Sequence, residues 1–177
     1  QADIEQLSQA KGQKILGLPT GLRDLDKVLG GLQKSHLVVV AGRPGMGKSS
    51  LAAQVALHVG KRFKARSLIF SLEMSAKELA RRLISSESGI SEARIKTANI
   101  GEGEWDSYYR AIETVSGLPI TIDDAGYLTP SQMRTRAMKL YLEQGLDLVI
   151  LDYLQLMRGD GKYQNNRTQE VGDISRA

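Results

Sequence analysis

The sequence feature that most restricts the fold is a glycine-rich segment at residues 42–49, GRPGMGKS, which matches the pattern G-x-x-x-x-G-K-[S/T] at every fixed position. An apolar run at residues 37–41 precedes it, and residues 48–63, which carry apolar residues at helical spacing, follow it. Glycines let the backbone wrap its N–H groups around a phosphate, and the start of a helix adds donors and a positive dipole end. The segment therefore predicts a phosphate-binding loop between a buried strand and a helix.

The residue types of this loop indicate a nucleoside triphosphate with a divalent cation. Lys48 supplies a mobile positive charge for the β- and γ-phosphates, and the Ser49 hydroxyl is suited to Mg²⁺. The predicted nucleotide contacts are Gly42, Arg43, Pro44, Gly45, Met46, Gly47, Lys48, Ser49 and Ser50.

The other apolar runs predict an α/β fold. Residues 37–41, 68–71, 120–123 and 148–152 form continuous apolar runs, which are typical of parallel strands covered by helices on both faces. Helical patterns lie at 48–63, 76–87, 104–116 and 131–144, and a short one at 22–29 ends at a Gly-Gly pair. Strands that alternate with helices predict a mostly parallel sheet with right-handed crossovers.

Composition excludes several classes of protein. The hydrophobic fraction of 41% is ordinary for a folded chain, so disorder is not expected as its main state. Without cysteine, and with only His36 and His58, the chain has no typical zinc site. No apolar run approaches the roughly 18 residues that a membrane span requires. We expect a soluble, cytoplasmic protein, and its net charge of +4 permits a polyanionic partner without requiring one.

A carboxylate near the metal is the next requirement of such a site, and two places in the sequence could supply it. Asp152 ends the apolar run 148–152, at the strand end where ligands of α/β sheets bind. Asp123 and Asp124 follow the run 120–123 in the same way. We favour Asp152 as the Mg²⁺ ligand because its strand is the more apolar, and the pair at 123–124 stays open as the alternative.

Hydrolysis also needs a group that orients or deprotonates water, and Glu73 follows the second apolar run directly. It would lie beside the phosphate loop if the second strand is close to the first. The alternative is a carboxylate at a helix start, since Ser75 and Glu78 have the spacing of a capping box. Spacing alone does not separate these two interpretations of Glu73.

Taken together, these segments resemble the RecA-like motor domain of DnaB-type replicative DNA helicases, over nearly the whole chain. The resemblance rests on LPTG at 18–21, RPGMGKS at 43–49, SLEMS at 71–75, IDD at 122–124 and LDYLQLM at 151–157. Gly45 stands where many members of the family have serine, and Ser49 where many have threonine.

The resemblance implies a role for each candidate residue. Glu73 becomes the base that activates the attacking water, and Lys48 the catalytic and phosphate-binding lysine. Ser49 and Asp152 become the Mg²⁺ ligands of a site that binds ATP. Residues 1–17 resemble the end of the linker helix and the linker, and 18–177 the N-terminal part of a RecA-like ATPase domain. Residues 167–176 resemble the helix after the metal-binding strand.

The resemblance also implies parts that lie beyond residue 177. The family continues with a fifth core strand that carries a γ-phosphate-sensing glutamine, with DNA-binding loops and with an arginine finger that acts on the neighbouring subunit. In the RecA-like sheet the fifth strand lies between the phosphate-loop strand and the strand of Asp152. We therefore expect an incomplete core in this chain, and little turnover by it alone.

The function implied is that of an ATP-driven helicase motor. It would form a homo-hexamer, translocate on single-stranded DNA at the replication fork, and work with a primase and a helicase loader in the bacterial replisome. Two alternatives remain. One is a RecA-like recombinase or repair ATPase, and the other is a nucleotide-binding fragment without turnover.

Overall fold

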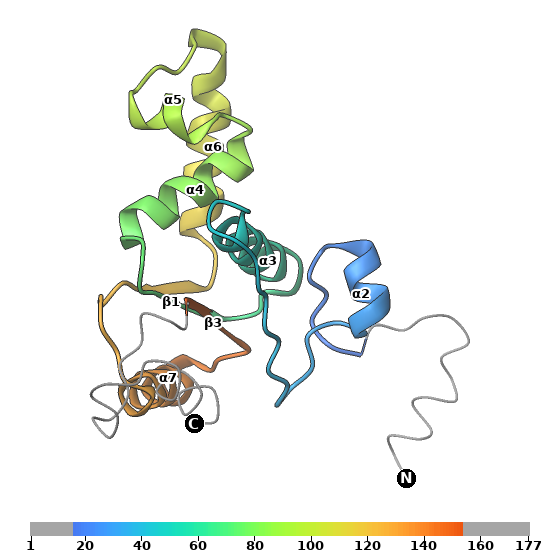
Figure 1. The fold of residues 1–177 in the computed structure, drawn as a ribbon. Helices are drawn as coiled ribbons and strands as arrows, with labels where there is room; N and C mark the ends of the chain where they lie inside the picture. Colours follow the sequence, from blue (N-terminus) through green and yellow to red (C-terminus); the bar gives the residue numbers. More distant parts are fainter. Residues whose placement is uncertain (1–15, 154–177) are drawn as a thin grey trace. The chain divides into compact units, whose positions relative to one another are not determined.

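The computed structural model describes residues 16–153 (Figure 1). These residues fall into two compact units, one up to residue 48 and one from residue 49 on. Each unit is described by itself below. The predicted linker helix within residues 1–17 and the predicted helix at 167–176 fall, apart from residues 16 and 17, outside the described residues. Among the helices that are described, none combines the length and the apolar character needed to cross a membrane.

The first unit is built around helix α2, Arg23–Leu29, as the periodicity at 22–29 predicts. Gly30 ends the helix in the left-handed conformation, with φ of 69°, which costs glycine little. An antiparallel bridge between Leu18 and Leu32 closes the segment. Gly17 is required by the close approach of the two chain segments, since a Cβ there would lie 2.4 Å from the carbonyl oxygen of Leu32.

A buried carboxylate fixes the entry to α2. Asp26 is 4% exposed and accepts hydrogen bonds from the backbone N–H of Thr20 at 2.7 Å, the Thr20 hydroxyl at 2.8 Å and the backbone N–H of Gly21 at 3.2 Å. These bonds satisfy a charge that would otherwise be expensive to bury. They explain why the segment LPTG precedes a helix with an aspartate in its first turns.

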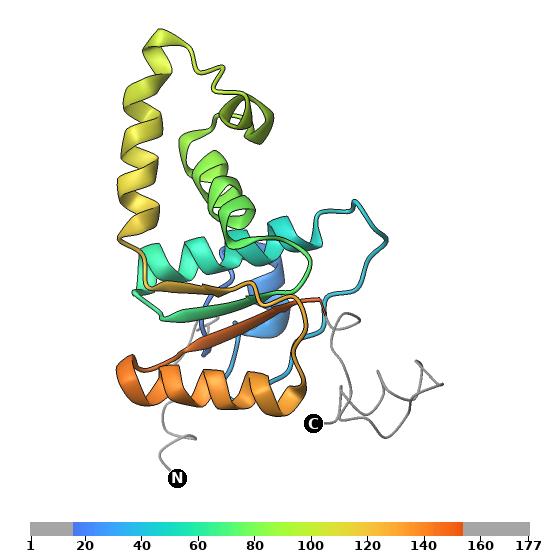
Figure 2. The ribbon, with the colours of Figure 1, turned by 90° about the vertical axis from the view of Figure 1, so that its left-hand side faces the viewer.

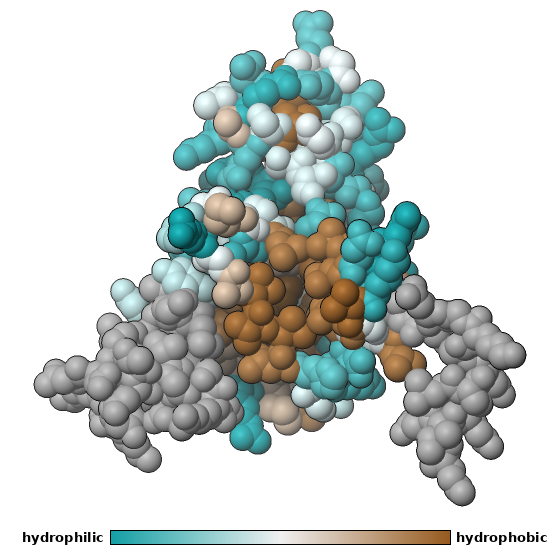
Figure 3. All heavy atoms as spheres, turned by 45° about the vertical axis from the view of Figure 1, so that its right-hand side comes forward, coloured by the Kyte–Doolittle hydropathy of each residue, from teal (hydrophilic) through white to brown (hydrophobic). Residues whose placement is uncertain are grey.

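The prediction of a strand at residues 37–41 is wrong for the described structure. No described strand pairs with this run, and its side chains are exposed, with Leu37 at 78% and Val39 at 77%. Exposed hydrophobic side chains appear in brown in Figure 3. A strand forms only when a neighbour satisfies its backbone N–H and C=O groups, and an apolar run lacking such a neighbour within 16–153 does not form one.

The second unit contains a parallel sheet of three strands, in the order β2-β1-β3. The central strand β1, Ser67–Ser71, pairs with β2, Ile120–Asp123, and with β3, Leu148–Asp152. All five residues of β1 are buried, as expected for a central strand covered on both faces. These three of the four predicted strands are confirmed.

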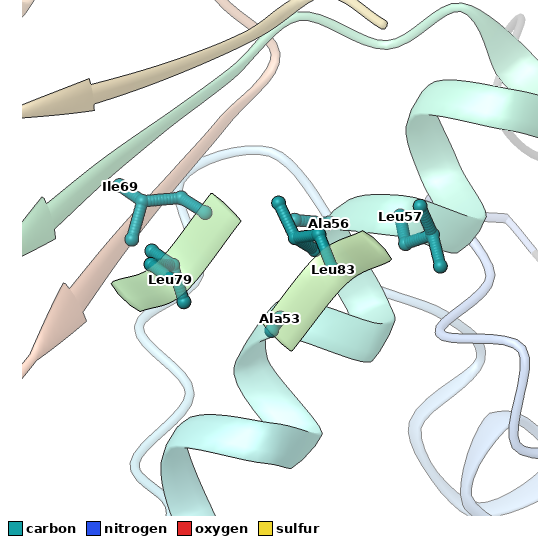
Figure 4. Close-up of a cluster of buried hydrophobic side chains, with 6 residues drawn as sticks. All are labelled: Ala53, Ala56, Leu57, Ile69, Leu79 and Leu83. Carbon is teal, nitrogen blue, oxygen red and sulfur yellow. The ribbon is translucent and has the colours of Figure 1, made fainter. Parts of the chain in front are cut away.

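Two helices cover one face of this sheet, as Figure 2 shows. Helix α3, Lys48–Phe63, and helix α4, Ala76–Ser88, pack against Ile69 of β1. The small residues Ala53 and Ala56 let the backbone of α3 approach the leucines of α4 closely. Figure 4 shows the buried cluster that results, formed by Ala53, Ala56, Leu57, Ile69, Leu79 and Leu83.

Helix α7, Pro130–Gln144, covers the opposite face. Its residues Met133, Ala137 and Leu140, spaced three and four apart, pack against the buried cluster that contains Leu68 and Phe70 of β1. Successive side chains of β1 point to opposite faces of the sheet, so Ile69 packs against α3 and α4, whereas Leu68 and Phe70 face α7. The predicted α/β arrangement with helices on both faces is therefore confirmed for the second unit.

The remaining elements form an extension between α4 and β2. They are α5, Glu92–Lys96, the 3₁₀ helix η1, Glu102–Glu104, and α6, Trp105–Ser116. Arg94 and Glu104 tie them together through two hydrogen bonds, one of them 2.9 Å between Nη1 and Oε1. The guanidinium of Arg94, which donates both bonds, holds the pKa of Glu104 below its usual value.

The N-terminus of α4 carries the predicted capping box. The Ser75 hydroxyl accepts from the backbone N–H of Glu78 at 3.3 Å, and the Glu78 carboxylate accepts from the backbone N–H and the hydroxyl of Ser75 at 3.0 and 2.8 Å. These donors lower the pKa of Glu78.

We expect Ser75→Ala to lower the free energy of unfolding of the second unit by about 1 kcal/mol, measured by urea denaturation, because the first turn of α4 loses its cap. The lowered pKa of the folded state means that ionised Glu78 stabilises the cap above its ordinary pKa, and that this contribution is lost as the pH falls through the lowered value. The difference between the variant and the wild type should therefore shrink in acid. Ser116→Ala, at an exposed helix end, is the matched control, and an equal loss there would contradict the capping role.

Candidate nucleotide-binding and catalytic site

Residues 42–48 of the predicted phosphate loop belong to the first unit and form a tight turn, in which two positions need glycine. Gly45 and Gly47 have φ of 76° and 84°, in the left-handed region that disfavours residues with a Cβ. No atom lies within 4 Å of the Cβ that either glycine lacks. Backbone conformation, rather than crowding, is therefore the reason for glycine at both positions.

Lys48 folds back over this loop. Its Nζ donates to the carbonyl oxygens of Gly42 at 2.9 Å and Arg43 at 3.1 Å. An ammonium group has three N–H donors, so two bonds to the loop leave one for a ligand. The lysine is thus held where the loop turns, as expected of a phosphate-binding lysine.

Helix α3 begins at Lys48 and carries Ser49 and Ser50 in its first turn, so the predicted helix start is confirmed. No acidic residue lies in that turn. The positive end of the helix dipole and the backbone N–H groups of the first turn are therefore not neutralised by a carboxylate of α3 and can attract an anion. The chain reverses between Phe63, where α3 ends, and Ser67, where β1 begins. The start of α3 therefore lies toward the end of the sheet where β1 ends (Figure 2).

Asp152 ends β3 at that same edge. It pairs with Ser71 in the register of the sheet, and its carbonyl oxygen accepts from the backbone N–H of Leu72 at 2.8 Å. The residue is 8% exposed, and within residues 16–153 no group donates a hydrogen bond to its carboxylate or forms an ion pair with it. A buried carboxylate of this kind is suited to a cation.

The donor set fits Mg²⁺ better than a transition metal. In the described part of the chain, no three His, Asp or Glu side chains converge on a point that could hold a metal ion. Mg²⁺ in nucleotide sites commonly uses one or two protein oxygens together with phosphate oxygens and water. The Ser49 hydroxyl and the Asp152 carboxylate supply such oxygens, so the residues fit the ion that the sequence predicts.

The alternative carboxylates, Asp123 and Asp124, are already engaged. Asp123 receives two hydrogen bonds of 2.7 Å from Nη1 of Arg136 on α7. Asp124 accepts from the backbone N–H of Ala76 at 2.8 Å, at the start of α4. Both carboxylates therefore connect helices to the end of β2, and these contacts favour Asp152 over them as the metal ligand.

Glu73 follows β1 and is exposed. Sequence spacing left open whether it serves the start of α4, but Ser75, Glu78 and Asp124 make the contacts there and Glu73 makes none of them. The structure thus places Glu73 just after β1 and Asp152 at the end of β3, two directly paired strands, at the edge of the sheet where α3 begins. The approach of residues 42–48 to these two carboxylates stays a prediction.

Comparison with known proteins identifies a family and relatives to which this chain is similar. A sequence model of the family described as "DnaB-like helicase C terminal domain" matches residues 17–177. The replicative DNA helicase DnaC of Bacillus subtilis is 38% identical over 174 residues, which cover 98% of this chain and 38% of the relative. The replicative DNA helicase DnaB of Nostoc is 40% identical over 177 residues, covering 99% of this chain and 20% of the relative. The chain thus spans well under half the length of these relatives.

Two solved structures share the fold. A DnaB-like replicative helicase, described with its interactions with primase, matches with a TM-score of 0.89 and 29% identity over 99% of this chain and 42% of that one. A second structure, described as an ATPase domain, matches with a TM-score of 0.90 and 29% identity over 99% of this chain and 62% of that one. These matches confirm the predicted fold class, a RecA-like α/β core, of which residues 16–153 form an incomplete part.

Proposed function

The chain belongs to the family of DnaB-like helicase C-terminal domains, and from this premise we propose that it is part of an ATP-driven motor that unwinds DNA at the replication fork. The observation that carries the proposal is the edge of the sheet in the second unit. There the buried Asp152 ends β3, Glu73 follows the strand paired with it, and helix α3 begins. A phosphate loop, a metal-binding carboxylate and a free carboxylate are the parts that ATP hydrolysis requires.

In this proposal each residue has a defined role. The backbone N–H groups of residues 42–50 surround the phosphates, and the Lys48 ammonium contacts the β- and γ-phosphates. Ser49 and Asp152 hold Mg²⁺, which would neutralise charge on the phosphate oxygens. Glu73 takes a proton from the water that attacks the γ-phosphorus, while the bond to the β–γ bridging oxygen breaks and ADP leaves.

We propose that the active form is a ring of six copies. A neighbouring subunit would complete each ATP site with an arginine finger, and single-stranded DNA would pass along the ring. Support comes from the two relatives described above, both of which are named as replicative DNA helicases, and from the structural neighbour described with primase. Primase and a helicase loader are the partners we propose for the longer protein, in the bacterial cytoplasm at the replisome.

Strand separation by the full-length protein tests the function. A forked duplex with single-stranded tails is incubated with the protein, ATP and Mg²⁺, and the released strand is measured. We expect unwinding with ATP and none with a non-hydrolysable ATP analogue. ATP hydrolysis stimulated by single-stranded DNA without any unwinding would instead favour a recombinase or repair ATPase. The absence of nucleotide binding and turnover would contradict both.

A further inference from the structure

Glu73, the proposed base, lies in a short connection between two elements of the second unit. Residues 72–75 join the end of β1 at Ser71 to the first turn of α4 at Ala76. A general base acts only where its carboxylate is within hydrogen-bond reach of the proton that it removes. The Glu73 side chain is exposed, so packing does not fix it. Its placement therefore depends on the backbone of this connection.

A buried serine at the start of the connection holds that backbone. Ser71 is 2% exposed, and its hydroxyl donates to the carbonyl oxygen of Met74 at 2.7 Å, the usual length for a hydroxyl donor. The bond joins the second residue before Glu73 to the residue directly after it, so it closes a turn around the proposed base. Since Ser71 belongs to β1, this turn is tied to the most buried strand of the sheet.

Other contacts fix the two ends of the connection. The backbone N–H of Leu72 donates to the carbonyl oxygen of Asp152 at 2.8 Å, which ties the start of the connection to the strand of the proposed metal ligand. At the far end, the backbone N–H of Ala76 donates to the Asp124 carboxylate at 2.8 Å. The bond from the Ser71 hydroxyl lies between these two fixed ends, at the place where the connection carries the proposed base.

We propose that Ser71 is a positioning residue for ATP hydrolysis, whose hydroxyl holds the turn at residues 71–74 so that the Glu73 carboxylate reaches the attacking water. The inference rests on the proposed function, in which Glu73 is the base, and it adds the residue that keeps the base in place. Ser71 acts through Glu73 and contacts neither the nucleotide nor the reacting atoms. Without its bond the turn can adopt other conformations, and a shift of about 1 Å in a reacting group can cost about 10²-fold in rate.

A double-mutant cycle with Glu73 tests this proposal. Turnover at saturating ATP is measured as phosphate release, and binding as the dissociation constant of a fluorescent ATP analogue, for the full-length wild type, Ser71→Ala, Glu73→Gln and the double variant. We expect Ser71→Ala to lower turnover about tenfold and to leave the dissociation constant unchanged. In the Glu73→Gln background the same change should lower turnover by less than about twofold, because no base remains to be positioned.

Two further variants separate the role of the hydroxyl from the general effect of a substitution in the core. Ser67 lies at the other end of β1, is 1% exposed, and its hydroxyl has no hydrogen-bond partner within residues 16–153. Ser67→Ala is therefore a matched change of a buried strand serine that removes no bond, and turnover should stay unchanged. Ser71→Thr keeps the hydroxyl and should retain most of the wild-type turnover.

The possible results separate this proposal from the proposed function. Wild-type turnover by Ser71→Ala, beside an impaired Glu73→Gln, would overturn the positioning role and leave Glu73 as the base. An equal loss from Ser71→Ala in both backgrounds, or the same loss from Ser67→Ala, would show an effect on the fold and would overturn it too. If circular dichroism shows that Ser71→Ala does not fold, Ser71→Cys, whose thiol is a weak donor, takes its place in both backgrounds. Wild-type turnover by Glu73→Gln would contradict the proposed role of Glu73 itself.

Discussion

Replacing Glu73 by glutamine is expected to reduce ATP turnover of the full-length protein by about 10² to 10⁴, the usual contribution of a general base, while ATP binding remains. Glutamine has nearly the same shape as glutamate and can still touch the attacking water, but it cannot take its proton. Glu73 makes none of the contacts at the start of α4, so the substitution should not disturb the fold. Turnover is measured as phosphate release, and binding as the dissociation constant of a fluorescent ATP analogue.

Glu113→Gln is the matched control for this prediction. Glu113 is an exposed residue of α6, and its loss of charge should leave turnover unchanged. A Glu73→Gln variant that releases phosphate at the wild-type rate would remove Glu73 from the mechanism. If turnover fell only in proportion to a loss of binding, Glu73 would hold the nucleotide instead of activating water.

Local sequence signals predicted most helices closely. Helix α3 has the predicted bounds, and α4 begins at the predicted residue because Ser75 and Glu78 define its first turn by themselves. Helix α7 begins at Pro130, one residue before the predicted start, since proline is well accommodated in a first turn. These features depend on residues within a few positions of one another, which is why a sequence pattern reveals them.

The wrong strand prediction at residues 37–41 shows that a local apolar pattern does not decide whether a strand forms. Its apolar composition is as strong as that of β3, Leu148–Asp152. Residues of β3 find β1 beside them, whereas the run at 37–41 has no strand partner in the part of the chain that the structure describes. Strand formation depends on pairing between distant segments, which hydrophobicity alone does not predict.

The choice among the aspartates also required tertiary contacts. Asp123 and Asp152 look alike in the sequence, each at the end of an apolar run. Arg136, thirteen residues after Asp123, forms an ion pair with the Asp123 carboxylate. Within residues 16–153, no basic side chain forms such a pair with Asp152. Helix packing also brings Gln54 of α3, Arg82 of α4 and Glu92 of α5 to the lining of one cavity of about 330 Å³, which no sequence pattern predicted because these residues lie on three separate helices.

Replacing Lys48 by alanine is expected to weaken ATP binding by about 30- to 700-fold, which corresponds to roughly 2–4 kcal/mol for removing one partner of a close charge pair. Unlike Glu73→Gln, this variant should lose affinity for ATP and for inorganic tripolyphosphate alike, since Lys48 contacts phosphates and not the nucleoside. Turnover at low ATP concentration should fall below detection. Both dissociation constants are measured by calorimetry in the presence of Mg²⁺.

The loop itself should tolerate the loss of Lys48. Its turn depends on the backbone conformations of Gly45 and Gly47, and the two bonds from Nζ of Lys48 lie at an exposed position. Lys139→Ala, on the exposed side of α7, removes an equal charge far along the chain and should leave binding unchanged. A folded Lys48→Ala protein that still bound tripolyphosphate with wild-type affinity would show that the phosphates lie elsewhere. That result would refute the assignment of residues 42–50 as the phosphate-binding loop.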